Sequence, residues 1–178
     1  MKLRKMLTAL LLAAGVVFVA GWKQADSPSE VVKKFFAAMV KFDFATAAKL
    51  SCGEQSAGMA ALAEDQNKFI GSMKASAKNG NEKAKILVKV YEKGGFVAVL
   101  EYLAEQGDKR AKQQVDRIKK FKLDTKGETI DGDFAEIDVV ISGGPGGKSV
   151  PDKAYAKKVN GEWKVIKEEE YKRERSVR

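Results

Sequence analysis

The dipeptide Asn160-Gly161 lies between two stretches of alternating residues and constrains the fold of this chain more than any other feature. A two-residue type I′ turn needs a positive φ angle at both central residues, and Asn and Gly adopt that conformation readily. The resulting hairpin pairs Val159 with Glu162, Lys158 with Trp163, Ala156 with Val165, and Tyr155 with Ile166. In this register Trp163 lies over small alanine residues, with the stem of Lys158 beside its indole ring. Helices from earlier in the chain must cover that face.

The residues before the hairpin predict two further strands, over 121–129 and 133–142, joined by a turn at Asp131-Gly132. Alternation places Ala135, Ile137, Val139 and Ile141 on one face of the second strand, and Phe134, Glu136, Asp138 and Val140 on the other. The second face is therefore mixed and suited to water or a pocket. The tail 168–178 is nearly all charge and is predicted to fray.

Two helices are predicted between residues 27 and 50. Ser27 is the expected cap of the first, Pro28 suits its first position, and Glu30 completes a capping box. One broad apolar face follows, made of Val31, Val32, Phe35, Phe36, Met39 and Val40. Asp43 is expected to cap a second short helix over residues 44–50. Both helices should contribute to the core.

Residues 54–120 read as a helical block with pieces at 54–78, 82–93, 96–106 and 108–120, each ending near a glycine. Two phrases in it, 77–85 and 104–112, are similar to each other and resemble the helix-turn-helix phrase of Sel1-like repeats. Repeat folds need about three units, so we interpret both as local helix-stop, helix-start signals. The chain is therefore predicted to be one α+β domain over 27–167. Its N-terminal helices pack on an antiparallel sheet of about four C-terminal strands, with residues 54–120 inserted between.

Residues 1–21 have the form of an export signal, with Lys2, Arg4 and Lys5 before an apolar run of 16 residues, 6–21. The run is shorter than the ~20 residues that a membrane-spanning helix needs. We expect export, with cleavage after Ala20 or Gly21 and a linker over 22–26. A retained signal anchor, associated with the membrane through residues 6–21, is the alternative. The expected location is the periplasm, free or membrane-associated.

The composition excludes several kinds of chemistry. The chain has one cysteine and no histidine, which removes disulfide frameworks, zinc sites built on Cys and His, and proton transfer by imidazole. No metal site and no cofactor are expected. The net charge of +9 falls to +6 without residues 1–21. This moderate excess is compatible with anionic surfaces and is not a nucleic-acid signal.

Four segments together resemble one family: Val31-Val32-Lys-Lys-Phe35-Phe36, residues 42–50, residues 132–139, and residues 157–165 with their Asn-Gly-Glu-Trp core. They are similar to small exported bacterial lipoproteins of unknown function in the nuclear-transport-factor-2-like superfamily. The resemblance implies a cone-shaped α+β fold, in which a curved antiparallel sheet wraps a long helix and can leave a pocket. The segment before Trp22 also resembles a lipobox. Its last residue should be a lipid-bearing cysteine, so Trp22 predicts that this chain is not lipidated.

Three further segments contain residues typical of binding or reactive sites. Residues 143–149 resemble a phosphate-binding P-loop, but the first glycine of that motif falls on Ser142 and a strand follows, so we expect a strand connection. Cys52 is either a reactive thiol at a helix start or a small buried residue, and the second is favoured. The densest basic run, residues 109–122 around Phe121, suits anionic lipid headgroups or envelope polymers, although a solvated helix face is the simpler interpretation.

These patterns favour an exported, non-enzymatic domain that binds a small ligand or an envelope protein through its sheet or its helical insertion. Nucleic acid is not an expected partner. The first alternative is an enzyme of the same fold, with Glu136, Asp138 and Tyr155 lining a pocket for Asp/Tyr acid-base chemistry. The second is a helical scaffold that binds another protein through an exposed apolar patch on residues 54–107.

Overall fold

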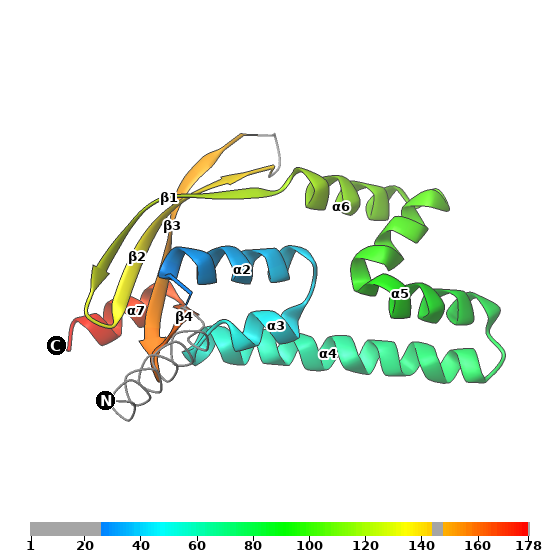
Figure 1. The fold of residues 1–178 in the computed structure, drawn as a ribbon. Coiled ribbons are helices and arrows are strands. Elements are labelled where there is room, and N and C mark those ends of the chain that lie inside the picture. The colour runs from blue at the N-terminus through cyan, green and yellow to red at the C-terminus, as the bar shows by residue number, and fades with distance from the viewer. Residues whose placement is uncertain (1–25, 144–147, 178) are drawn as a thin grey trace, which may run out of the picture.

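The computed structural model describes residues 26–143 and 148–177, which form six helices and a four-stranded sheet (Figure 1). The helices are α2 (Pro28–Val40), α3 (Phe44–Lys49), α4 (Gly53–Lys78), α5 (Glu82–Glu105), α6 (Lys109–Lys120) and α7 (Glu168–Arg175). The strands are β1 (Lys122–Asp131), β2 (Phe134–Ser142), β3 (Val150–Val159) and β4 (Glu162–Ile166). The predicted α+β class is confirmed. The predicted export signal, the lipobox-like segment and most of the glycine-rich loop lie outside the described residues.

The sheet is antiparallel in the order β1-β2-β3-β4. The predicted hairpin register is confirmed, including Lys158 opposite Trp163, and the Lys158 ammonium lies 5.8 Å from the indole centroid. Asn160 and Gly161 have φ angles of 51° and 84°, as a type I′ turn requires. The first turn lies one residue later than predicted, at Gly132-Asp133, because Asp131 still pairs with Phe134.

The main core lies between α2 and the inner face of the sheet, which curves over this helix in Figure 1. Ser27 and Glu30 form the predicted capping box, so α2 starts where the sequence indicates. The apolar face of α2 then meets the inner residues of β2 and β3: Val31, Val32 and Phe35 pack with Ala135, Ile137, Val139, Ala154 and Ala156. The small alanines leave room for the helix and the indole ring.

The C-terminal tail does not fray as predicted, because it folds as α7 against the outer face of the sheet (Figure 1). Tyr171 is only 4% exposed and packs on Phe134 and Tyr155, with ring centroids 5.6 and 4.6 Å away. The buried Glu170 carboxylate accepts a hydrogen bond from the Glu54 backbone amide at the start of α4. The Tyr171 ring, the Glu170 carboxylate and the ion pairs of Glu174 with Lys157 and Arg175 with Asp131 therefore hold a helix that its charge composition argues against.

The helical insertion, residues 54–120, extends from the sheet as α4, α5 and α6 and returns to β1 (Figure 1). Asn81 and Asp108 cap α5 and α6 in the two phrases interpreted as helix-stop, helix-start signals. Helix α5 is broken at Gly94-Gly95, where both residues leave the helical conformation, so the two predicted helices meet there without a loop. No helix in the described part of the chain is long and apolar enough to cross a membrane.

Candidate functional site

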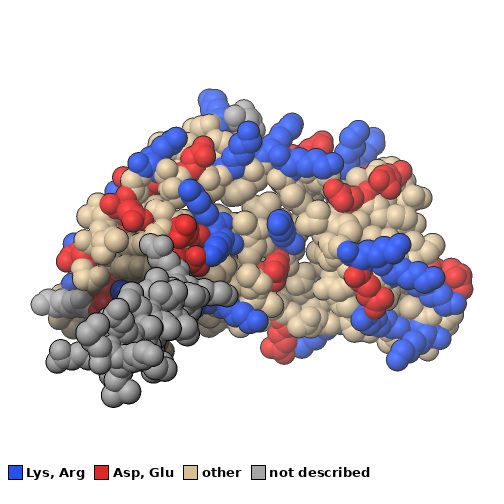
Figure 2. All heavy atoms as spheres, viewed as in Figure 1, with Lys and Arg blue, Asp and Glu red and all other residues tan. Residues whose placement is uncertain are grey.

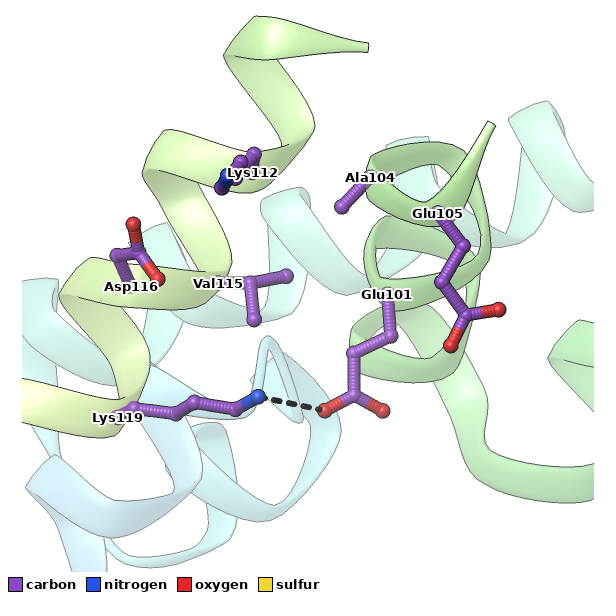
Figure 3. Close-up of a pocket in the computed structure, with 7 residues that line it drawn as sticks. All are labelled: Glu101, Ala104, Glu105, Lys112, Val115, Asp116 and Lys119. Atoms are coloured by element: carbon purple, nitrogen blue, oxygen red, sulfur yellow. Dashed lines mark ion pairs between the residues drawn. The ribbon is translucent and has the colours of Figure 1, made fainter. Parts of the chain in front are cut away.

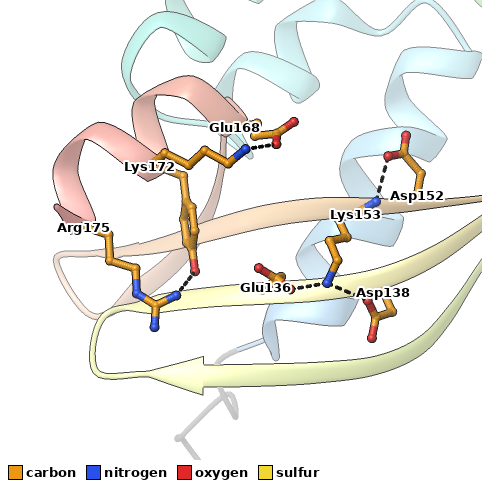
Figure 4. Close-up of polar contacts among 8 residues, drawn as sticks. Glu136, Asp138, Asp152, Lys153, Glu168, Lys172 and Arg175 are labelled. Atoms are coloured by element: carbon orange, nitrogen blue, oxygen red, sulfur yellow. Dashed lines mark hydrogen bonds and ion pairs between the residues drawn. The ribbon is translucent and has the colours of Figure 1, made fainter.

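Glu136 and Asp138, the carboxylates predicted to line a pocket, lie on the outer face of β2 beside Lys153 of β3 (Figure 4). Lys153 forms ion pairs with both, at 3.2 Å from Asp138. The hydrogen bonds that the Lys153 ammonium donates to the two carboxylates raise the pKa of Lys153 above its ordinary value. The ammonium therefore offsets part of the charge of the two carboxylates across the strand pair, which is an arrangement typical of sheet surfaces.

Tyr155, the third predicted pocket residue, is buried beneath α7. Burial raises the pKa of its phenol, and the nearby carboxylates of Glu168 and Glu136 act in the same direction. Glu168 pairs with Lys172, which lowers the pKa of the Glu168 carboxyl (Figure 4). Neither of the two cavities described below is lined by Glu136, Asp138 or Tyr155. A phenol kept neutral at high pH and a paired carboxylate are poorly matched to acid-base catalysis near neutral pH.

Cys52 is the N-cap residue of α4 and is half-buried. Its backbone amide donates to the Val165 carbonyl at 2.9 Å, which fixes the start of α4 to β4. Burial and the Glu170 carboxylate both raise the pKa of the thiol. A raised pKa disfavours the thiolate, so this cysteine behaves as the small packing residue that the sequence favours.

A groove of about 430 Å³ runs between α5 and α6 (Figure 3). Its lining mixes charges of both signs, with Glu101 and Glu105 from α5 facing Lys112 and Lys119 from α6. The ammonium of Lys119 and the carboxylate of Glu101 are 4.0 Å apart. The lining is polar and apolar in about equal parts, and most of the residues that line it are charged, so the groove lacks the aromatic surface that favours small ligands.

A second cavity, the junction pocket, lies where the helical insertion meets the α+β core and is the best candidate site. It measures about 360 Å³ and is lined by the α2–α3 turn, α4 and the break in α5. Its lining residues are Lys41, Phe42, Asp43, Ala45, Ala63, Gln66, Asn67, Tyr91, Gly94, Gly95 and Phe96. The volume falls in the range of small-molecule sites, which are usually apolar with a few polar groups.

Phe42 occupies an unusual backbone conformation at the mouth of this pocket. Its φ angle is +58°, in the left-handed region that residues other than Gly, Asn and Asp rarely adopt. The Asp43 amide donates to the Ala38 carbonyl at 2.9 Å and the Phe42 amide to the Met39 carbonyl at 3.0 Å. These two bonds form a Schellman motif, in which glycine is the usual residue at the position of Phe42. A phenylalanine there costs about 1 kcal/mol in backbone energy.

Phe96 is the centre of the aromatic cluster around the pocket. Its ring centroid lies 6.0 Å from that of Phe42, 6.1 Å from Phe69 and 6.2 Å from Tyr91. The break at Gly94-Gly95 redirects α5 immediately before Phe96, and Gly95 has φ 67° and ψ −154°, a conformation restricted to glycine. Because Phe69 is 52% exposed, the cluster is open on one side.

The polar residues that line the pocket are Lys41, Asp43, Gln66 and Asn67, together with the Tyr91 hydroxyl. The Gln66 side-chain amide donates to the Phe42 carbonyl at 3.1 Å, which holds the strained turn in position. Lys41 and Asp43 flank Phe42 and are exposed. This arrangement suits a flat apolar or aromatic molecule with one polar end.

Sequence reasoning did not identify the junction pocket. Its aromatic residues come from three separate segments, and nothing in the local sequence indicates a left-handed Phe42. One local pattern could have indicated the pocket, namely the glycine pair at 94–95 followed directly by Phe96. From sequence alone, we interpret this pair only as the end of a helix.

Comparisons of the chain with protein-family models, curated proteins and solved structures find no match. Within the residues that the structure describes, no group of three or more Cys, Asp or Glu side chains is arranged to hold a metal ion.

Proposed function

We propose that this chain is an exported, non-enzymatic binding domain of the bacterial cell envelope, and that its junction pocket binds a small flat ligand. The assignment to the envelope is supported by the signal-like residues 1–21 and by the resemblance to lipoprotein-like members of the nuclear-transport-factor-2-like superfamily. The ligand class is supported by the pocket lining, in which Phe42, Tyr91 and Phe96 present aromatic surface.

The observation that carries the proposal is the left-handed conformation of Phe42 in an aromatic pocket. Strained backbone conformations persist where the surrounding structure over-determines them, and they concentrate at ligand-binding sites. Glycine would form the same Schellman turn without strain. The phenyl ring is therefore present at an energetic cost, and ligand contact gives it a role that the turn does not require.

The test uses Phe42→Gly, which removes the phenyl ring and keeps the turn. The loss of ring contacts and the relief of backbone strain oppose each other, so we expect the free energy of unfolding to fall by no more than about 1 kcal/mol. The probe is anilinonaphthalene sulfonate, a fluorescent aromatic anion whose sulfonate can lie near Lys41. We expect the wild-type chain to enhance its fluorescence, and Phe42→Gly and Phe96→Ala to weaken its binding by about fivefold or more.

The matched control is Phe121→Ala, which removes a half-buried ring stacked on Phe36 away from the pocket. Its affinity for the probe should equal that of the wild type. Equal affinity of Phe42→Gly and wild type would overturn the proposal, because the ring would then serve packing alone. Equal loss in Phe121→Ala would show that the probe reports loosened structure and not the junction pocket.

A further inference from the structure

The exposed side of α6 is strongly basic, with a single acid among its cations. Ala111, Gln114, Val115 and Ile118 face the protein, as their burial shows, and at 3.6 residues per turn the opposite side holds Lys109, Arg110, Gln113, Asp116, Arg117 and Lys120. The single acid of the helix, Asp116, borders the groove with Lys112 and Lys119 and is itself exposed, four residues before Lys120. We call the four outward cations, Lys109, Arg110, Arg117 and Lys120, the basic face.

The basic face is not neutralised within the protein. Lys119 is the one α6 residue with an ion pair to a described carboxylate, and it is not part of this face. Figure 2 shows Lys and Arg side chains gathered along the edge that α6 forms with the neighbouring end of the sheet. The charge is therefore available to a partner of opposite sign.

Helix stability explains only half of the basic face. Arg117 and Lys120 lie in the last turn, where cations interact favourably with the helix dipole. Lys109 and Arg110 are the first two residues of α6, where the same dipole disfavours positive charge. These two cations oppose the helix dipole, and the adjacent Asp108 carboxylate, which caps α6, is the acid nearest to them in the sequence.

We propose that the basic face of α6 docks on the surface of an anionic lipid bilayer. Clustered Lys and Arg residues on one helix face are attracted to anionic headgroups, with each cation contributing separately. The apolar face of α6 is buried against the protein, so this contact is electrostatic and requires no insertion. The proposal does not depend on the junction pocket or on its ligand.

The fold allows this contact together with an N-terminal membrane attachment. Ser29, at the start of α2, donates a hydrogen bond to Glu128 of β1, and β1 begins beside α6 at Lys122. Six residues of strand separate these points by about 20 Å. A chain held at a bilayer through residues 6–21 could therefore place the basic face on the same surface.

The test is cosedimentation of the full chain with two kinds of vesicle, pure phosphatidylcholine and equal parts phosphatidylcholine and phosphatidylglycerol. Any binding through residues 6–21 occurs with both, so the difference in affinity measures the electrostatic contact. A variant with Lys109→Gln, Arg110→Gln, Arg117→Gln and Lys120→Gln should lose affinity for the anionic vesicles by about tenfold or more and bind the neutral ones as before. Glutamine preserves helix propensity, and circular dichroism checks the fold.

The matched control removes four cations from elsewhere in the insertion, with Lys78→Gln, Lys83→Gln, Lys89→Gln and Lys93→Gln, all exposed positions. Its affinity should stay within about threefold of the wild type. Equal loss in the two variants would overturn the proposal, because binding would then follow net charge. Tighter binding of wild type to duplex DNA than to the anionic vesicles at one ionic strength would also overturn it, and would assign the surface to nucleic acid.

Discussion

Gly53 shows how closely α7 is fitted to the start of α4. Its φ angle is +56°, and a Cβ atom added there would lie 2.0 Å from the Glu170 carboxylate oxygen. The same carboxylate caps α4 through the Glu54 amide at 3.0 Å. Glycine is therefore required here by its backbone conformation and by the space that the capping carboxylate occupies.

We predict that Gly53→Ala lowers the free energy of unfolding by about 2 kcal/mol or more, because it combines left-handed strain with loss of the cap. Urea unfolding followed by Trp163 fluorescence measures this. Gly58→Ala is the control, because that exposed helical position is open within 4 Å and alanine there should stabilise the protein by about 0.5–1 kcal/mol. Equal effects of the two substitutions would show that Glu170 does not restrict position 53.

Tyr155 should make stability depend on alkaline pH. Its folded-state pKa is raised above 10.0, so its contribution is complete below that pH and is lost as pH rises towards the folded value, where only the unfolded chain ionises. Tyr155→Phe removes this loss. We expect wild type to lose more stability than the variant between about pH 8 and about pH 11, measured by urea unfolding. Parallel pH profiles would contradict the burial of the phenol.

At the level of elements, local signals predicted structure well where the stabilising contacts are also local. The capping box of α2, the Asp43 cap of α3 and the Asn160-Gly161 turn each involve residues within three positions of one another, and all form as predicted. Helix α7 and the junction pocket depend on contacts between distant segments. Tyr171 packs on Phe134 and Tyr155, and Phe42 packs on Phe96. No short stretch of sequence contains both partners of these contacts, so local patterns do not predict helix α7 or the pocket.

Helix α7 should be a stabilising part of the domain, in contrast to the frayed tail that its charge predicts. Tyr171→Ala removes a ring that is 4% exposed, and we expect a loss of about 2–4 kcal/mol in the free energy of unfolding. Val177→Ala, at a side chain 84% exposed, is the control and should have no effect. Urea unfolding measures the free energy of unfolding of both variants. If the tail does not dock, Tyr171→Ala and Val177→Ala will have the same free energy of unfolding.

Across the whole molecule, the two proposed surfaces lie on parts that the helical insertion brings into place. The junction pocket forms where α4 and α5 meet the α2–α3 turn, and the basic face lies on α6 where the insertion returns to the sheet. Stacking of Phe36 on Phe121, with centroids 6.5 Å apart, ties that return point to α2. The α+β core therefore serves as the support, and the insertion carries the features that a partner would meet.

The location of the chain is the prediction on which both surfaces depend. If residues 1–21 are a cleaved export signal and Trp22 prevents lipidation, expression in a Gram-negative host should yield a soluble periplasmic protein shortened near Ala20 or Gly21. Trp22→Cys should restore the lipobox, so that the product gains the mass of a lipid and moves to the membrane fraction. Intact mass and cell fractionation measure both. Full-length protein in the membrane fraction would instead indicate a signal anchor, which would hold α6 permanently near a bilayer, whereas full-length protein in the cytoplasm would refute export and remove the envelope from the proposed function.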